Sequence, residues 1–326
     1  MVDLDLKDRK ILYELDLNCR QSNAQIGKKV GLSRKVVEYR IKRMEDDGAI
    51  TGYSTLIDIF KLGYHVYRLY LKLQDIPPDI KNELVSLFIN YKNVWVVHST
   101  TGKFDIGSVI FVDNVYEFYN FYNNIVDNYG NYISEKTTGI YVIADEYEKT
   151  YLLSEVKDNH KRLHYPIICD GSICEIDELD YKILNKIVVN ARIPLIKLAD
   201  ELKTSHQTIN NRIKCLLSNG VIKNFRVDID FSKIGLKYFY IQFILKDTSK
   251  RNDIINFVKL LPSFKCLNVA IGYTEMDLEF IFNTIEEMDD LLDKLENKFP
   301  NSIRSFYYFK NRQTHKERWL PEMEFK

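Results

Sequence analysis

The residues that could do chemistry are concentrated in one basic stretch near the N-terminus. Between Lys28 and Arg43 the chain carries seven basic side chains and a single acidic one, Glu38. Guanidinium and ammonium groups at this density suit phosphate oxygens. Within the stretch, Arg34 and Lys35 could reach guanine edges, and Glu38 could accept a hydrogen bond from a cytosine amino group. This chemistry is that of a nucleic-acid surface.

The segment 22–48 has the pattern of two short helices joined by a glycine. Ser22 and Gln25 form a capping box, and Gly31 supplies the left-handed residue that ends the first helix. Ser33 caps a second helix with apolar residues at spacings of four and three. Such a helix-turn-helix normally places its second helix in the DNA major groove. The predicted first DNA-binding surface is Lys28, Lys29, Ser33, Arg34, Lys35, Glu38, Tyr39, Lys42 and Arg43.

The same pattern occurs twice in the chain. A shift of 172 residues aligns 8–12 (DRKIL) with 180–184 (DYKIL) and continues through the helix-turn-helix, where caps and apolar positions are kept. Arg40 recurs as Arg212 beside the apolar seam, so a structural ion pair explains it at least as well as a DNA contact. The outer face of the second copy is polar: Ser205, His206, Gln207, Asn210, Asn211 and Lys214. Its amides and hydroxyls suit adenine edges, and its few charges predict weaker, more sequence-dependent binding.

Each helix-turn-helix is followed by strands and helices in the order β-α-β-β-α-β, which is the ferredoxin-like arrangement. In the first copy the expected strands are 66–73, 94–99, 106–111 and 133–143. The predicted fold class is α+β, a tandem duplication of a winged helix-turn-helix and a ferredoxin-like βαββαβ domain. The expected boundaries are 1–58 and 174–230 for the helix-turn-helix domains, 64–152 and 236–326 for the ferredoxin-like domains, and 153–173 for a linker with a basic patch at 160–164.

This combination resembles the Lrp/AsnC (leucine-responsive, or feast/famine) transcription regulators. The matching residues of the first copy are Leu4-Asp5, Asp8, Ile11-Leu12, Arg20, Gly31-Leu32-Ser33, Arg40 to Met44, Gly48 and Ile50. The second copy departs where Lys203 replaces Gly31, so a non-glycine residue must adopt a positive φ there or the corner must change.

The resemblance implies a sequence-specific transcriptional regulator of double-stranded DNA rather than an enzyme. Because family members pair through their effector domains, the chain resembles a covalent pseudo-dimer, with an asymmetric operator. The resemblance also implies a small-molecule effector, such as an amino acid, near a Gly-x-x-Asp turn. By position this marks Gly102 and Asp105 and, in a turn two residues longer, Gly272 and Asp277. A tight turn that needs glycine and a capping aspartate is the alternative explanation.

Composition excludes several function classes. Lys plus Arg and Asp plus Glu are 46 each among 326 residues, so any basic surface must be local. The chain has no membrane-length apolar run and no apolar signal core at its start, so we expect a cytoplasmic protein without a membrane partner. The five scattered cysteines are expected to be free thiols. No nucleophile triad, phosphate loop or metal-spaced ligand set occurs, so no cofactor is expected. Assembly into homo-oligomers stays open.

Two alternatives remain at this point. Sirohaem decarboxylases share this two-part fold, and His98 lies on a predicted strand where a catalytic group could sit. Its neighbourhood, VVHSTTGKFD, lacks the Tyr and Arg cluster that an anionic macrocycle requires, and the second copy has Ala270 at the aligned position. The other alternative is a sensor or interaction protein whose second helix-turn-helix no longer binds DNA.

Overall fold

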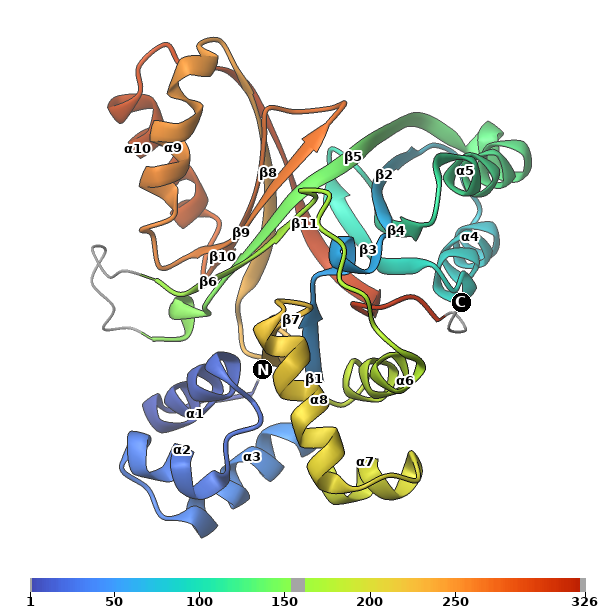
Figure 1. The fold of residues 1–326 in the computed structure, drawn as a ribbon. Helices are drawn as coiled ribbons and strands as arrows, with labels where there is room; N and C mark the ends of the chain where they lie inside the picture. Colours follow the sequence, from blue (N-terminus) through green and yellow to red (C-terminus); the bar gives the residue numbers. More distant parts are fainter. Residues whose placement is uncertain (1, 154–161, 323–326) are drawn as a thin grey trace.

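The computed structural model describes residues 2–153 and 162–322, which form two copies of one α+β unit (Figure 1). Each copy starts with a winged helix-turn-helix module. The first module contains α1 (Leu6–Leu17), α2 (Asn23–Val30), α3 (Arg34–Asp46) and β1 (Ile50–Ile57). The second contains α6 (Glu178–Ile187), α7 (Leu195–Glu201), α8 (His206–Ser218) and β7 (Ile222–Ile229). Among the described residues, no helix has the length and apolar character needed to cross a bilayer.

The helix-turn-helix modules follow the predicted local rules. The capping box of Ser22 and Gln25 is formed, and Gly31 ends α2 in the left-handed conformation with φ of 70°. In the second module Lys203 adopts a φ of 53°, so the corner is kept without glycine, at the strain that a side chain brings to this region. The predicted apolar positions of both second helices are buried: Val37, Ile41, Met44, Ile209, Ile213 and Leu216.

Each module continues into a ferredoxin-like domain, as predicted. The first domain contains β2 (His65–Leu73), α4 (Pro78–Asn90), β3 (Val94–Gly102), β4 (Ile106–Val112), α5 (Val115–Tyr129) and β5 (Ile133–Tyr147). The second contains β8 (Lys237–Leu245), α9 (Arg251–Val258), β9 (Phe264–Ile271), β10 (Met276–Phe282), α10 (Glu286–Lys298) and β11 (Ile303–Glu317). Short 3₁₀ helices occur at η1 (Ile59–Leu62), η2 (Gly130–Tyr132), η3 (Thr150–Leu152) and η4 (Thr248–Lys250). Helices α4 and α5 cover one sheet, and α9 and α10 cover the other (Figure 1).

The two sheets join edge to edge through their last strands. The first part of β5 pairs with β2 of its own half, and residues 140–146 pair with β9 of the other half. In the same way β11 pairs first with β8 and then, through residues 309–317, with β3. The described strands therefore close into a hydrogen-bonded ring in the order β5-β2-β4-β3-β11-β8-β10-β9. The strand predicted at 133–143 was too short, because the residues beyond it find their partner in the other half.

Part of the connection between the halves lies within the described residues. Residues 154–161 of the predicted linker, including His160 and Lys161 of the basic patch, lie outside the described residues. The following segment forms β6 (His164–Ile168), which pairs with the end of β5. Arg162 of the same patch is buried and donates to the carbonyl oxygens of Leu261 and Phe264 at 2.9 and 2.8 Å. Residues 162–168 of the predicted linker therefore pack against the ferredoxin-like domains.

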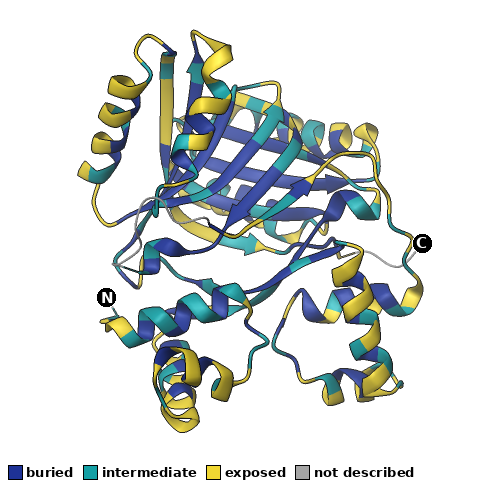
Figure 2. Ribbon diagram, turned by 60° about the vertical axis from the view of Figure 1, so that its left-hand side comes forward, coloured by how far each residue is buried: buried dark blue, intermediate teal, exposed yellow. Residues whose placement is uncertain are grey.

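Buried apolar residues form a layer under each pair of covering helices and a larger core between the sheets and the helix-turn-helix modules. Figure 2 shows the strands largely buried and the outer faces of the helices exposed. The alignment of the two halves changes within this framework. The shift is 172 residues from β2 to β8 but 170 from β5 to β11, because 20 residues connect β2 to β3 and only 18 connect β8 to β9.

Candidate nucleic-acid interface and the cavity between the sheets

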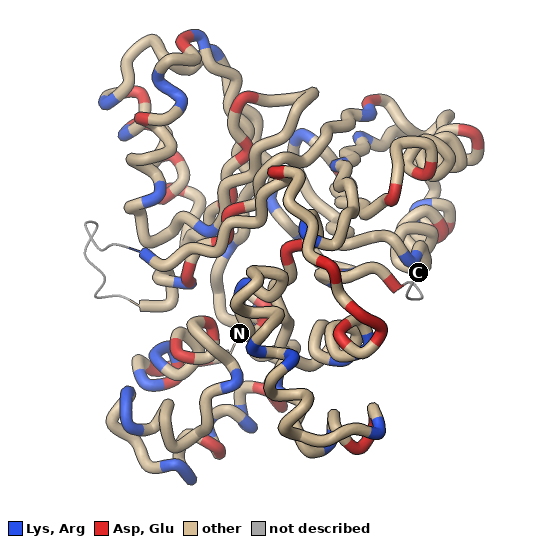
Figure 3. The backbone as a smooth tube through the Cα atoms, viewed as in Figure 1, with Lys and Arg blue, Asp and Glu red and all other residues tan. Residues whose placement is uncertain are grey.

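The outer face of α3 presents the predicted basic surface to solvent. Lys28, Arg34, Lys35 and Glu38 are exposed, and Tyr39 is 68% exposed. Within the described residues, no carboxylate pairs with Arg34 or Lys35. Figure 3 shows several Lys and Arg segments on the α1–α3 module. This arrangement leaves the two side chains in the first turn of α3 available for an external anion.

Other residues of this predicted surface already have partners. Lys29 pairs with Glu14 at 2.6 Å and Lys42 with Asp46 at 2.5 Å. Such exposed pairs contribute little to stability, so a DNA phosphate could replace either carboxylate. The Ser33 hydroxyl oxygen accepts a hydrogen bond from the backbone N–H of Val36 and caps α3. Only its O–H remains for DNA.

Arg43 of the predicted surface forms an ion pair inside the module. It donates to the carboxylate of Asp8, which is only 1% exposed. Arg40 donates to the same carboxylate at 2.8 Å and to Asp5 at 2.7 Å. The prediction that Arg40 forms a structural ion pair is confirmed, and Arg212 repeats the arrangement with Asp177 and Asp180 at 2.7 and 3.2 Å. Arg43 belongs with these structural groups because its guanidinium neutralises a buried carboxylate that holds α3 against α1.

The second recognition helix presents a different chemistry. His206, Gln207, Asn211 and Lys214 are exposed, and Asn210 is half-buried. Gln207 Nε2 donates to Asn211 Oδ1 at 3.0 Å, which fixes one amide beside the other. The hydroxyl oxygen of Ser205 caps α8 by accepting from the N–H of Thr208. The outer face of α8 therefore offers paired amides and one lysine where α3 offers arginine and lysine.

A two-stranded ribbon fixes the two modules to each other. β1 and β7 pair antiparallel, with Tyr53 opposite Val227. The N–H of Cys19 donates to Phe225 O, and the N–H of Ala191 donates to Tyr53 O, both at 2.8 Å. These two bonds are related by the repeat, so each module holds the wing of the other. Both modules lie on the same side of the strand ring (Figure 1).

A cavity of about 1160 Å³ lies between this ribbon and the inner faces of the sheets. The repeat does not give it two equal walls. By the structural alignment, Arg68 corresponds to Tyr240, Trp95 to Lys265, and Val109 to Glu279. The second half therefore carries the ion pair of Lys265 and Glu279 where the first carries Trp95 and Val109. In the opposite sense, the first half carries the cation Arg68 where the second carries Tyr240. The lining also includes His98, Tyr141, Glu146, Tyr238, Asn268 and Trp319.

Alternating charges connect the cavity to the first module. Lys265 Nζ lies 2.9 Å from Glu279 and 3.0 Å from Glu146, and Glu146 lies 3.0 Å from Arg226 on β7. Arg226 pairs with Asp16 on α1 at 2.7 Å. Burial alone would raise the pKa of Asp16, but Arg226 and Lys149 outweigh it and hold the pKa at about 2. The pKa of Glu279 is likewise about 2, because Lys265 and Arg68 outweigh its burial.

Comparison with known proteins identifies the two modules. A winged helix-turn-helix DNA-binding profile matches residues 4–51, and an AsnC-type helix-turn-helix profile matches residues 176–217. An uncharacterized HTH-type transcriptional regulator of Pyrococcus furiosus is 32% identical over 107 residues, which are 32% of this chain and 69% of the relative. This chain belongs to the Lrp/AsnC family of transcription regulators.

Further relatives agree with this assignment. The HTH-type transcriptional regulator Ptr1 of Methanocaldococcus jannaschii is 27% identical over 161 residues, covering 48% of this chain and 97% of the relative. Nearly the whole relative therefore aligns with about half of this chain, as expected if the relative has one copy of the unit. The solved structure of the siroheme decarboxylase NirDL superposes with a TM-score of 0.61, at 10% identity over 95% of this chain and 92% of that one. At this identity the likeness shows that the two share a fold.

The predicted effector residues of the second half require a correction, because Asp277 is not the counterpart of Asp105. Asp105 accepts from the N–H of Leu73 at 2.9 Å, and Glu275 accepts from the N–H of Leu245 at 3.2 Å. Glu275 is therefore the counterpart of Asp105, and the second turn is no longer than the first. Asp277 lies inside β10, fully buried, and accepts from Tyr273 at 2.8 Å.

The two turn glycines lie where the halves approach each other. Gly102 has a φ of 125°, and a Cβ there would lie 2.6 Å from Tyr308 O on β11. Gly272 has a φ of 123°, and its Cβ would lie 3.0 Å from Thr138 O on β5. These observations support the alternative explanation that the turns need glycine for their backbone conformation. The close approach of the other half is a second reason why no side chain fits there.

His98 lies in the cavity among groups that the local sequence does not contain. Its ring centroid is 5.7 Å from Tyr240 and 6.3 Å from Tyr238, and Arg68 lines the same space. The expectation that His98 lacks a Tyr and Arg neighbourhood is therefore wrong, because other strands supply it. Its structural counterpart is Asn268, not Ala270, since His98 is opposite Gly107 and Asn268 is opposite Asp277. Burial lowers the pKa of His98 to about 3, so the imidazole is neutral.

A sequence signal for the cavity existed. Arg68 interrupts the apolar run VYRLYL, and Glu279 interrupts LEFIF. Residues on both faces of β2 are buried. A charged side chain inside a strand that is buried on both faces must therefore point into a polar interior.

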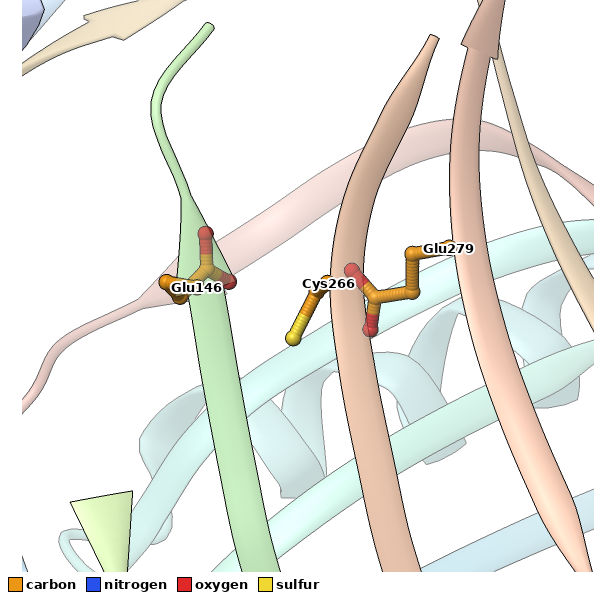
Figure 4. Close-up of side chains that lie close together, drawn as sticks. All are labelled: Glu146, Cys266 and Glu279. Carbon is orange, nitrogen blue, oxygen red and sulfur yellow. The ribbon is translucent and has the colours of Figure 1, made fainter. Parts of the chain in front are cut away.

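Glu146, Cys266 and Glu279 come close enough to suggest a metal site (Figure 4), with ligand atoms within 4.8 Å of one another. The charges favour an ion pair instead. Lys265 contacts both carboxylates, and burial raises the pKa of the Cys266 thiol well above its ordinary value. Because Lys265 already supplies the counter-charge of Glu146 and Glu279, we treat these groups as the ion-paired wall of the cavity. All five cysteines are free thiols, as predicted.

Proposed function

We propose that this Lrp/AsnC protein is a sequence-specific regulator that binds one asymmetric operator as a covalent pseudo-dimer. The supporting observation is the β1–β7 ribbon, which holds two recognition helices of different chemistry on the same side of the molecule. In a symmetric dimer the two helices would present identical faces and favour a palindrome. Here α3 presents Arg34 and Lys35, whereas α8 presents Gln207 and Asn211 at the same end of the helix.

The two modules would contribute different parts of the binding free energy. Lys28, Arg34 and Lys35 neutralise phosphates, which sets affinity and its salt dependence. Amides and the His206 imidazole contribute sequence selection by contacts to base edges. The first module therefore supplies most of the affinity, and the second narrows the choice of site.

The experiment is to map bound DNA across the genome and then measure binding to the recovered sites at several salt concentrations. Arg34→Ala with Lys35→Ala should weaken binding to all sequences and flatten the salt dependence. His206→Ala with Gln207→Ala should weaken binding to the best site more than to random DNA. Lys246→Ala, an exposed lysine after β8, is the matched control. Unchanged affinity in both double variants would refute the proposal.

We also propose that the chain acts as one unit whose domains are 1–58, 64–152, 174–230 and 236–326. β5 pairs with β9, and β11 pairs with β3, so the edge strands of each sheet find their partners in the other half of the same chain. A monomer by light scattering is the expected result. An obligate dimer would mean that these edges pair between chains.

A second candidate function is chemistry on a sirohaem-like macrocycle, without DNA binding. The observation that favours it is the position of His98 beside Arg68, Tyr238 and Tyr240 in the cavity. A neutral His98 could act as a base but could not donate a proton near neutral pH. Incubation with sirohaem tests this candidate, because carbon dioxide release together with an altered absorbance spectrum would establish turnover. We expect neither.

A further inference from the structure

We propose that the cavity between the two sheets binds a planar organic carboxylate, with the guanidinium of Arg68 as its anchor. This inference goes beyond the DNA-binding function and does not depend on it. It also differs from an effector at the family's Gly-x-x-Asp turns, because Arg68 lies on β2 and faces the space between the halves.

Among the described residues, Arg68 is a buried cation with no carboxylate within ion-pair distance, and Asp277 and Glu279 act on it only at longer range. It is 4% exposed, and it donates one hydrogen bond, at 2.5 Å, to the hydroxyl of Tyr70. Its Nε is buried and has no hydrogen-bond partner within the described parts of the chain. A buried guanidinium is normally paired, because removing its charge from water is costly. The unfilled donors of Arg68 therefore point to an external anion.

Asp277, the carboxylate that contacts the Tyr70 hydroxyl, does not take the place of an external anion at Arg68. Tyr70 donates in turn to Asp277 Oδ2 at 3.1 Å, so Asp277 reaches Arg68 only through the phenol. Burial raises the pKa of Asp277. Two other cations that line the cavity have carboxylate partners. Lys265 lies between Glu146 and Glu279, and Arg226 lies between Glu146 and Asp16.

The walls beside Arg68 are flat. Its guanidinium carbon lies 4.8 Å from the ring centroid of Tyr141. Tyr238 and Tyr240 stack at 4.7 Å on the facing strand, and Trp95 meets Trp319 edge to face at 4.4 Å. Aromatic walls with one anchoring cation select a planar apolar body that carries an acidic group. Ligand pockets commonly range from about 300 to 1,000 Å³, so this volume admits ligands from a single ring to a macrocycle.

The only two tryptophans of the chain, Trp95 and Trp319, both line the cavity. Their intrinsic fluorescence therefore reports occupancy without a label. The probes are phenylacetate and its neutral match phenylacetamide. Sirohaem serves as a macrocyclic carboxylate. Its binding is measured by calorimetry, because its absorbance would interfere with the tryptophan fluorescence. We expect saturable binding of at least one carboxylate, and binding of phenylacetamide at least tenfold weaker than that of phenylacetate if the small ring is the ligand.

Substitutions separate this site from a general effect on folding. Arg68→Gln should weaken carboxylate binding at least tenfold, and Arg68→Lys should restore part of it. Arg304→Gln, an exposed arginine on β11, is the matched control and should bind as the wild type does. If Arg68→Gln fails to fold, Val96→Phe, which narrows the cavity without removing a charge, should weaken binding instead. The proposal is overturned if no carboxylate binds saturably, or if binding survives in folded Arg68→Gln or in Val96→Phe.

Discussion

The carboxylate of Asp16 on α1 accepts hydrogen bonds from Nε and Nη2 of Arg226 on β7, at 2.7 and 2.9 Å. The two residues lie in opposite halves of the chain, and both are buried. Because Arg226 also pairs with Glu146, the helix-turn-helix of the first half is connected through buried charges to the wall of the cavity. The counterpart of Arg226 in the first half is Ser54 and that of Asp16 is Val188, so this connection exists on one side of the molecule only.

Asp16→Asn should destabilise the protein by about 3–5 kcal/mol, because it leaves two buried cations, Arg226 and Lys149, without their shared counter-charge. Urea unfolding followed by circular dichroism measures the change. Asp46→Asn is the matched control, since Asp46 and its partner Lys42 both lie in solvent and such a pair contributes little to stability. Equal effects of the two substitutions would show that the buried pair has no special role.

His98 should make the stability depend on pH. Its pKa is lowered to about 3 in the folded protein, whereas an unfolded histidine has a pKa of about 6.5. The unfolded state therefore binds more protons between these values, and stability falls as the pH decreases through this window. The slope is at most about 1.4 kcal/mol per pH unit.

His98→Asn copies the residue found at the equivalent position, Asn268, and removes this contribution. Unfolding free energies measured from about pH 7 down to pH 5 should show a shallower slope in the variant. His65→Asn, an exposed histidine at the start of β2, is the control and should leave the slope close to that of the wild type. A slope that persists in His98→Asn would assign the pH dependence to other groups.

Gly102→Ala should weaken the contact between the two halves. Its positive φ alone makes alanine unfavourable by roughly 1–2 kcal/mol, and the added Cβ would meet Tyr308 O at 2.6 Å. We expect a further loss of about 1–3 kcal/mol from this overlap. Gly171→Ala is the matched control, because Gly171 also has a positive φ but no atom within 4 Å of the added Cβ. Thermal unfolding of both variants measures the difference, and no difference would contradict the close approach.

The helix-turn-helix modules could be predicted because their determinants are local. Caps, a glycine corner and apolar residues at helical spacing all lie within 27 residues, from Ser22 to Gly48. Even the departure at Lys203 was predictable, since the fold needs a left-handed residue at this corner whatever its type. The ends of β5 and β11 were not predictable, because the residues that pair with them lie in the other half.

The cavity could not be derived from the sequence for a related reason. Arg68, His98, Lys265 and Glu279 lie on four strands separated by as much as 211 residues, and no local spacing brings them together. The connection from β8 to β9 is two residues shorter than that from β2 to β3, and the unshifted alignment therefore paired Asp105 with Asp277. Only the hydrogen bonds to Leu73 and Leu245 show that Glu275 is the true counterpart.

Arg34→Ala and Arg43→Ala should separate DNA contacts from structural charges. Arg34 is exposed and has no described partner, so its loss should leave stability unchanged within about 0.5 kcal/mol. It should reduce the slope of log affinity against log salt by about 0.9, the value for one phosphate contact. Arg43 neutralises the buried Asp8, so its loss should destabilise the protein by at least about 1 kcal/mol. Its salt slope should stay near that of the wild type, provided that binding is measured well below the melting temperature. If Arg43→Ala lowers the slope as much as Arg34→Ala does, then Arg43 contacts phosphate directly and its assignment to the interior of the module is wrong.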